Sequence, residues 1–162
     1  MRRKDRQVTD KDQLQAIIDQ CDICRLGLYD GQEVYILPAN FGYSWQGELP
    51  VLYFHGATKG RKLEIIAQNP RAAFEMDCSH QLVTGDAPCD WSMEYQSIVG
   101  QGVLEVVEDE AERLRGLDLL MQKHGYRGNQ GYDPNVLKRT FILRLTVTQM
   151  SGKGFQNKAD ND

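Results

Sequence analysis

Three cations in four positions follow an aromatic run in the stretch YFHGATKGRK, residues 53–62. Lys59, Arg61 and Lys62 stand where a strand, a glycine-containing turn and the start of a helix are expected to meet. The first backbone N–H groups of a helix have no acceptor within the helix, and the helix dipole adds positive charge there. Arginine binds phosphate bidentately and lysine acts as a point charge. The stretch is therefore either a phosphate-binding site or a solvated basic turn.

A histidine ends the apolar run that leads into these cations. His55 is open to two interpretations: a hydrogen-bonded structural residue, or an imidazole that orients a substrate or donates a proton, since histidine titrates near neutral pH. The other two histidines, His80 and His124, are interpreted as surface residues, with nothing in the sequence to pair them.

The cysteines permit three interpretations. Cys21 and Cys24 form a C-x-x-C, which is typical of half a zinc site, of a redox pair, or of two ordinary reduced thiols. Cys78 and Cys89 do not form a second close pair. Cys24 also opens an apolar run, where a small buried thiol is common. We expect ordinary reduced cysteines.

Length and charge exclude several classes of protein. The chain has 162 residues and a formal net charge of −4, with a pI near 5.4, which argues against broad binding of nucleic acid, because such binding depends on neutralising phosphates. No stretch approaches the roughly 18 consecutive apolar residues of a membrane span, and residues 1–20 lack the apolar segment of a signal peptide. We expect a cytosolic protein with one domain at 1–152 and a polar, disordered tail at 153–162.

Three helices are expected, at 10–20, 60–68 and 109–123. Asp10 and Asp109 stand at the positions of N-terminal caps. The first helix carries an apolar stripe with helical spacing, formed by Leu14, Ile17 and Ile18.

Six strands are expected. Two alternating runs flank Asp30-Gly31, a strong hairpin signal. The glycines at 100 and 102 predict a bend or a close backbone approach in a long strand, while residues 79–94 are interpreted as irregular. The remaining expected strands are 51–55, 71–78, 97–109 and 140–150. Because the connections are mostly hairpins and no βαβ rhythm is present, the sequence predicts a mainly β fold: a six-stranded antiparallel barrel with about three helices.

Three stretches occur in an order and spacing that identify a family: VYILPANFGY, LYFHGATKGRKLEIIAQNP and CDWSMEYQSIVGQG. Together they resemble the FMN-binding split-barrel proteins related to pyridoxamine 5'-phosphate oxidase, and within these the nitroimidazole-resistance (Nim) group. The resemblance covers residues 1 to about 152. It implies a six-stranded split barrel that forms a homodimer, with one FMN in each of two clefts at the subunit interface.

The resemblance also implies a set of flavin contacts. Pro38, Ala39 and Asn40 fall along the isoalloxazine edge, and Phe54 and His55 fall on the next flavin-contacting strand. The phosphate-binding pair of the oxidases falls within Lys59, Arg61 and Lys62, in agreement with the interpretation from charge.

Other positions depart from the family pattern or stay open. Ser97 stands where the oxidases have a polar glutamine contact. Trp91 either packs in the core or forms a wall of the flavin cleft from the neighbouring subunit, and Arg25 is either an interface ion-pair partner or a flavin contact. Tyr43 and Trp45 flank an expected turn, where exposed aromatics would suit a dimer interface.

The function that the resemblance implies is an FMN-dependent oxidoreductase that reduces nitroaromatic compounds or other small acceptors, with electrons from NAD(P)H or another reductase. No G-x-G-x-x-G follows a strand, so a nicotinamide would visit the flavin without a dinucleotide fold of its own. The C-terminal arginine and histidine that bind pyridoxamine phosphate in the oxidases have no counterpart in TQMSGKGF, which argues against that substrate. The alternatives are a flavin-binding module without turnover, and a haem-binding split barrel with His55 as the ligand.

Overall fold

The computed structural model describes residues 3–156, and the structural statements below concern that part of the chain. Its strands are β1 (Gln7–Val8), β2 (Cys24–Tyr29), β3 (Val34–Ala39), β4 (Gly42–Gln46), β5 (Leu49–Ala57), β6 (Arg71–Val83), β7 (Ser92–Val106) and β8 (Thr140–Phe155). Its helices are α1 (Lys11–Gln20), α2 (Arg61–Gln68), α3 (Glu110–Lys123) and α4 (Pro134–Leu137), with short 3₁₀ turns η1 (Lys4–Arg6) and η2 (Pro88–Asp90).

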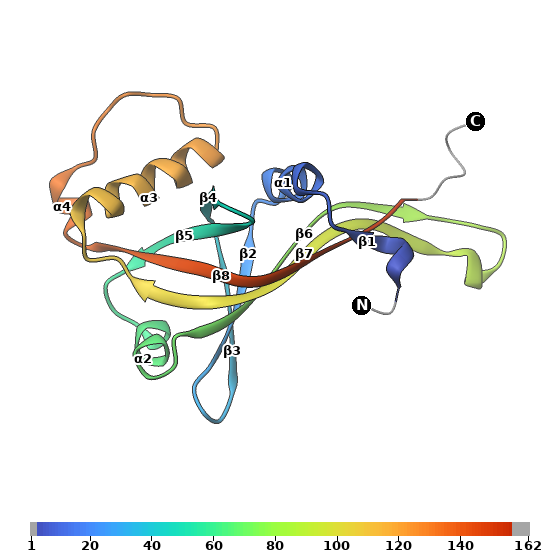
Figure 1. Cartoon of the computed structure of the whole chain (residues 1–162), viewed down its shortest axis with the longest axis horizontal. Coiled ribbons are helices and arrows are strands. Elements are labelled where there is room, and N and C mark those ends of the chain that lie inside the picture. The colour runs from blue at the N-terminus through green and yellow to red at the C-terminus, as the bar shows by residue number, and fades with distance from the viewer. Residues whose placement is uncertain (1–2, 157–162) are drawn as a thin grey trace.

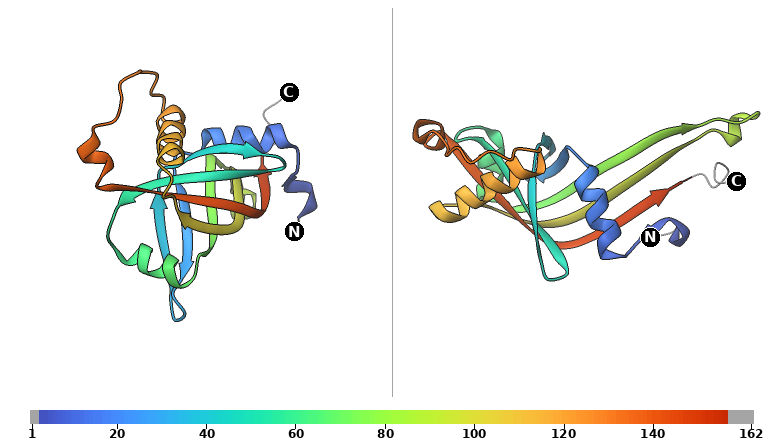
Figure 2. Two further views of the ribbon diagram at one scale, coloured as in Figure 1. Left: turned by 60° about the vertical axis from the view of Figure 1, so that its left-hand side comes forward. Right: turned by 90° about the horizontal axis from the view of Figure 1, so that it is seen from above.

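All strands join one antiparallel sheet, in the order β3-β2-β6-β7-β8-β5-β4, with β1 paired to β8. The sheet curls on itself into a split barrel, with α2 and α3 at one end and a long β6–β7 hairpin reaching away from the other (Figures 1 and 2). The predicted class, a mainly β antiparallel split barrel, is confirmed. The sheet has eight strands and not six, because β1 and β4 were not expected.

The expected caps form as the sequence indicates. The Asp10 side chain accepts a hydrogen bond from the Gln13 N–H at 2.9 Å, and α1 then buries the predicted apolar stripe. Asp109 accepts one from the Glu112 N–H at 2.8 Å at the start of α3. Each carboxylate satisfies a donor that has no partner within its helix, which fixes where the helix begins.

The β2–β3 hairpin is closed by its predicted turn. Asp30 Oδ1 accepts hydrogen bonds from the N–H groups of Gln32 (2.9 Å) and Glu33 (2.7 Å). Gly31 has φ +98°, a conformation that glycine adopts without strain. These contacts with backbone N–H groups, followed by the Arg61 guanidinium, lower the pKa of Asp30 to about 2.

The two glycines of β7 sit where the backbone is closely approached, as predicted. A Cβ at Gly100 would lie 2.4 Å from the Phe74 ring, and one at Gly102 would lie 2.4 Å from the Thr146 carbonyl oxygen. The β7–β8 register shifts between Gln101 and Gly102. The glycines therefore let β7 bend across the core.

The expectation of an irregular segment at 79–94 is wrong. β6 continues to Val83 and β7 begins at Ser92, so most of the segment forms the extended hairpin (Figure 1). A register shift between Cys78 and Gln81, with Ser79 at φ +58°, interrupts the ladder. A hairpin exposed on both faces has no apolar alternation, which explains why the pattern did not reveal it.

The stretch around Gly47 is also more regular than expected. β4 and β5 form a tight hairpin there, and Gly47 has φ +68°. Tyr43 and Trp45 do not form an exposed aromatic patch, because both are partly buried against the main core. The Tyr43 hydroxyl donates a hydrogen bond to Asp19 Oδ1 at 2.7 Å, which ties β4 to α1.

The strand β8 continues through Phe155, beyond the expected domain end at residue 152. The remainder of the expected tail, 157–162, lies outside the described residues. Within residues 3–156, no helix is both long enough and apolar enough to cross a bilayer.

Helix α3 sits unusually close to the sheet. A Cβ at Gly42 of β4 would lie 2.3 Å from the Leu120 backbone nitrogen and 2.5 Å from the Leu119 carbonyl carbon. On the helix side, a Cβ at Gly116 would lie 2.9 Å from the ring of Tyr53 in β5. Glycine on both surfaces allows this close packing, which covers a second core cluster of Val51, Tyr53, Val107, Leu117 and Ile142.

We expect Gly42→Ala to destabilise the protein, because the added methyl group meets the backbone of α3. A backbone, unlike a side chain, cannot avoid the clash by changing rotamer. Overpacking of this kind costs about 1–3 kcal/mol, which corresponds to a Tm lower by roughly 2–10 °C in a domain of this size. Gly131→Ala is the matched control, since a Cβ there meets nothing within 4 Å. Equal melting temperatures for the two variants would contradict the close seating of α3.

Candidate functional site

A cavity of about 360 Å³ lies between the edge of the sheet and the helices α3 and α4. We call it the α3 cavity. Its polar lining comes from Asn40 after β3, His55 on β5, His124 at the end of α3, Tyr132 and Thr140. Its apolar lining is formed by Leu117, Leu120, Met121, Val136 and Leu137. The volume and the mixture of apolar walls with a few polar groups are typical of a site for a small ligand.

Strand alternation explains why His55 reaches this cavity. Val51, Tyr53 and His55 are two residues apart along β5, so they share the face that α3 covers. Val51 and Tyr53 are buried beneath the helix, whereas His55 lies beyond it and is exposed. The imidazole is therefore placed by the strand and left accessible by the length of the helix.

Hydrogen bonds hold the helical walls of the cavity in place. Arg113 Nη2 donates to the carbonyl oxygens of Leu137 (2.9 Å) and Thr140 (2.8 Å), which ties α4 and the start of β8 to α3. The Tyr132 hydroxyl donates to Asp118 Oδ1 at 2.8 Å. Partial burial, together with this carboxylate, raises the pKa of Tyr132 to about 12. Tyr132 therefore stays protonated and keeps this hydrogen bond at neutral pH.

The three predicted phosphate-binding cations lie at the β5–α2 connection, immediately after His55 along the chain, but they point in different directions. Arg61 Nη2 donates to Asp30 Oδ2 (2.9 Å) and Glu33 Oε2 (3.4 Å), both in the β2–β3 turn. Two carboxylates thus already neutralise the guanidinium, and a phosphate would have to compete with them for it. The sequence did not indicate this pairing.

Lys62 lies toward the strand and not toward the turn. Its Nζ is 5.2 Å from the centre of the Phe141 ring, and a Cβ at Gly56 would come within 2.9 Å of that nitrogen. Lys59 is exposed in the connecting turn. The Asp30 turn therefore engages Arg61, whereas Lys62 lies against Phe141 and Lys59 is exposed.

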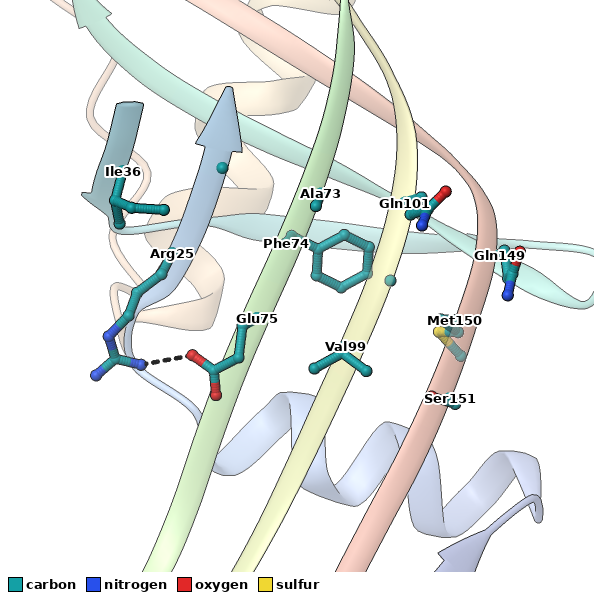
Figure 3. A pocket seen from close by; sticks show the side chains of 12 residues that line it. Arg25, Ile36, Ala73, Phe74, Glu75, Val99, Gln101, Gln149, Met150 and Ser151 are labelled. Atoms are coloured by element: carbon teal, nitrogen blue, oxygen red, sulfur yellow. Dashed lines mark hydrogen bonds and ion pairs between the residues drawn. The ribbon is translucent and has the colours of Figure 1, made fainter. Parts of the chain in front are cut away.

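Other predicted site residues lie on the outer face of the sheet. Pro38 pairs with Arg25, and Ser97 pairs with Asp77, so all four side chains share that face. A shallow cavity of about 480 Å³ opens next to them, lined by residues of β2, β3, β6, β7 and β8 (Figure 3).

Arg25 is an ion-pair partner within its own chain. Its Nη1 lies 3.0 Å from Glu75 Oε2 and 2.5 Å from Asp77 Oδ1. The prediction that nothing pairs His80 is wrong, because His80 Nε2 lies 2.7 Å from Asp77 Oδ2. Burial and the neighbouring Asp77 carboxylate raise the pKa of Glu75, an effect that the Arg25 guanidinium opposes.

Besides the residues already placed elsewhere, three further predicted residues do not line the α3 cavity. Phe54 is buried in the main core, and Ala39 packs against that core, so only their backbone groups can face a ligand. Trp91 follows η2 on the extended hairpin, is 53% exposed, and donates from Nε1 to the Gly85 carbonyl oxygen at 2.9 Å. Its side chain is therefore not part of this subunit's core.

The sequence analysis missed His124 as a site residue, although a signal was present. Leu117, Leu120, Met121 and His124 follow the spacing i, i+3, i+4, i+7 and therefore lie on one face of α3. That face lines the cavity. His124 thus continues the apolar stripe of α3 and lines the cavity with it.

The C-x-x-C does not supply reactive thiolates. Cys21, Cys24 and Cys78 are buried and Cys89 is exposed, and all four are free thiols. Burial raises the pKa of both Cys21 and Cys24, so both thiols are protonated at neutral pH, whereas metal binding and thiol exchange need the thiolate. Among the described residues, no group of three or more His, Cys, Asp or Glu side chains is placed to hold a metal ion.

Comparison with known proteins gives one family. Residues 10–154 match the profile of the family described as pyridoxamine 5'-phosphate oxidase. No protein of curated function matches the sequence significantly.

Solved structures agree with that match. A candidate 5-nitroimidazole antibiotic resistance protein from Bacteroides thetaiotaomicron is 30% identical, with a TM-score of 0.79, over 92% of this chain and 86% of that one. An FAD and heme binding protein from Mycobacterium smegmatis shares the fold at 22% identity and a TM-score of 0.76, over 97% of this chain and 77% of that one. The flavocytochrome Anf3 from Azotobacter vinelandii does so at 17% identity and a TM-score of 0.77, over 99% of this chain and 76% of that one.

Proposed function

The chain belongs to the pyridoxamine 5'-phosphate oxidase family, and from this we propose that it is an FMN-binding oxidoreductase that reduces a small acceptor. Nitroaromatic compounds of the 5-nitroimidazole type are the acceptors that its likeness to the Bacteroides protein favours. One observation carries the proposal: β5 delivers His55 into the α3 cavity and then ends at the β5–α2 connection with its three cations. A single strand thus links a cavity for a small molecule to a place for a phosphate.

The residues at the β5–α2 connection fit the phosphate of FMN. Gly60 is the N-cap residue of α2, with φ +134°, and a Cβ there would meet nothing within 4 Å, so the first turn of the helix begins at an open, uncrowded position. Lys59 and Lys62 add charge there. Arg61 can bind the phosphate bidentately only by sharing its guanidinium with Asp30 and Glu33.

The groups after β3 fit the ring of the flavin. The Asn40 amide lines the α3 cavity and can hydrogen-bond the pyrimidine edge. Ala39 and Phe54 directly precede Asn40 and His55 in the chain, so their backbone groups adjoin two residues that line the cavity. FMN, when bound, supplies the exchange of electrons between NAD(P)H and the acceptor. The chain holds the phosphate, orients the acceptor, and uses the His55 imidazole to donate a proton to the acceptor as it is reduced.

A second copy of the chain completes the site in this proposal. The outer face of the sheet exposes the apolar side chains of Val34 (67% exposed), Ile36 (58%), Val99 (49%) and Val103 (43%). A further shallow cavity of about 700 Å³, which includes three of them, adjoins the first. An apolar face of this kind is typical of an interface, and two-fold symmetry is the commonest way to cover it. Ser97 lies on the same face, and Trp91 on the extended hairpin is free to reach the partner's cleft.

Haem binding is a second candidate, because His55 and His124 line the same cavity and two imidazoles can act as axial ligands. The FAD and heme binding protein of the same fold gives this possibility a precedent. A Soret band in place of flavin absorbance in the purified protein would favour haem over FMN.

We expect a homodimer. Val99→Lys places a charge in the middle of the apolar outer face, so it should give a monomer by light scattering at micromolar concentration and weaken FMN retention. Val106→Lys is the matched control, because Val106 is 45% exposed on the opposite side of the same strand. A wild-type monomer that still holds FMN would overturn the proposed arrangement.

We expect the double variant Arg61→Ala/Lys62→Ala to lose affinity for FMN by at least about a hundredfold, because it removes two charge-assisted contacts worth about 1.5–3 kcal/mol each. Riboflavin, which has no phosphate, should bind almost as well as to the wild type. Lys62→Ala alone should account for the larger share, since Arg61 is already engaged by two carboxylates. Titration of each flavin by fluorescence quenching measures both affinities, and equal losses for the two ligands would indicate a damaged fold.

We expect the purified protein to be yellow and to oxidise NAD(P)H in the presence of a nitroaromatic acceptor. His55→Ala should stay folded and yellow, while turnover per bound FMN falls by roughly tenfold to a thousandfold, depending on whether proton donation or positioning is lost. A purely structural role for His55 gives the reverse result: a lower Tm, looser flavin and an unchanged normalised rate.

A further inference from the structure

Two imidazoles line the α3 cavity from different walls. His55 belongs to the sheet, while His124 is the C-cap residue that directly follows α3. The apolar side chains between them come from α3 and α4 and offer no hydrogen bonds. A ligand in this cavity therefore meets polar groups at its edges and apolar groups over its faces.

The wall that carries His124 is fixed. The His124 N–H donates to the Leu120 carbonyl oxygen at 3.2 Å. The neighbouring Lys123 Nζ donates to the carbonyl oxygens of Asp19 (3.0 Å) and Cys21 (2.7 Å), which ties the end of α3 to the end of α1. The imidazole thus projects from a backbone that is anchored on two sides, as a positioned binding group requires.

The apolar lining excludes one class of acceptor. A charged molecule would lose hydration against these apolar side chains, and only the two imidazoles could offset the loss, because the cavity lining contains no Asp, Glu, Lys or Arg. A neutral ring keeps its faces against Leu117, Met121 and Leu137, and its edges remain free for hydrogen bonds.

Resting on the proposed function, we propose that the α3 cavity receives the acceptor beside the flavin edge that Asn40 contacts, and that His124 selects this occupant. The occupant is a neutral, flat heteroaromatic molecule with a reducible group at one edge and a ring nitrogen at the other. The reducible group lies toward His55, and the ring nitrogen accepts a hydrogen bond from the His124 imidazole. A 5-nitroimidazole has this pattern of groups, whereas nitrobenzene has the reducible group and lacks the ring nitrogen.

The test compares these two acceptors in His124→Leu, which keeps the bulk of the side chain and removes its hydrogen bonds. The KM for 2-methyl-5-nitroimidazole should rise by about threefold to tenfold, the effect of one lost neutral hydrogen bond. The KM for nitrobenzene should stay within twofold of the wild type, and so should kcat with either acceptor and the content of FMN. His80→Leu is the matched control, because it makes the same change outside the α3 cavity.

A second variant tests the cavity itself. Val136 is 51% exposed on α4 and lines the cavity, so Val136→Trp should fill the space without disturbing the core, and it should weaken both acceptors by about tenfold or more. Binding of the nitroimidazole can also be measured directly, by ligand-observed NMR without NADH. This measurement compares Val136→Trp with the wild type when no turnover occurs.

The outcomes separate the two proposals. A colourless protein, or one that does not pass electrons to any acceptor, refutes the proposed function, and the NMR measurement then decides the cavity alone. The role of His124 is refuted if flavin content and turnover are normal but His124→Leu changes the KM for both acceptors equally, or changes neither. Unchanged binding in Val136→Trp refutes the cavity as the acceptor pocket.

Discussion

The seating of α3 on the sheet is the contact on which the candidate site depends. Gly42 and Gly116 have no side chains, so α3 packs closely on the sheet. A Cβ at either position would lie less than 3 Å from an atom of the opposite element. The Tyr53 hydroxyl reinforces this contact with a hydrogen bond of 3.2 Å to Glu112 Oε1. Because α3 is held there, its apolar stripe faces His55 across a narrow cavity instead of solvent. A helix displaced by the width of one side chain would leave His55 on an open strand.

A second constraint is the division of charge at the β5–α2 connection. The chain has an excess of carboxylates overall, and two of them, Asp30 and Glu33, already hold the guanidinium of Arg61. This pairing ties the β2–β3 turn to the start of α2 even without a ligand. In the proposed FMN site, a phosphate would have to compete for Arg61 but not for Lys59, whose side chain is exposed in the turn. Such a site would be organised before it binds, at the expense of part of the affinity that a free arginine would give.

The sequence could predict those parts of the fold in which a short local pattern, such as a cap or a turn, matches the structure that the segment adopts in the folded chain. Asp10 and Asp109 cap their helices and Asp30-Gly31 closes its hairpin, because each of these depends on neighbours in the chain. Gly100 and Gly102 could be predicted for another reason: a glycine inside a strand pattern itself indicates a bend or a close approach. The extended β6–β7 hairpin was missed because both of its faces are exposed and carry no apolar alternation. The ion pairs of Arg25 and Arg61 were missed because they join residues 28 to 52 positions apart, which periodicity cannot relate.

The site shows the same division between local and long-range information. His55 was predicted as a site residue from the basic stretch beside it and from the family resemblance. The structure places it in a cavity whose other lining residues are Asn40 and eight residues between 117 and 140, far along the chain. His124 had the spacing of a cavity-lining residue, yet only the close packing of α3 reveals which face of that helix meets a space and which meets the core. The reducing chemistry would belong to the cofactor in any member of such a family. The choice of acceptor would then rest with α3, α4 and the segment between them, because these elements, more than the barrel, shape the α3 cavity.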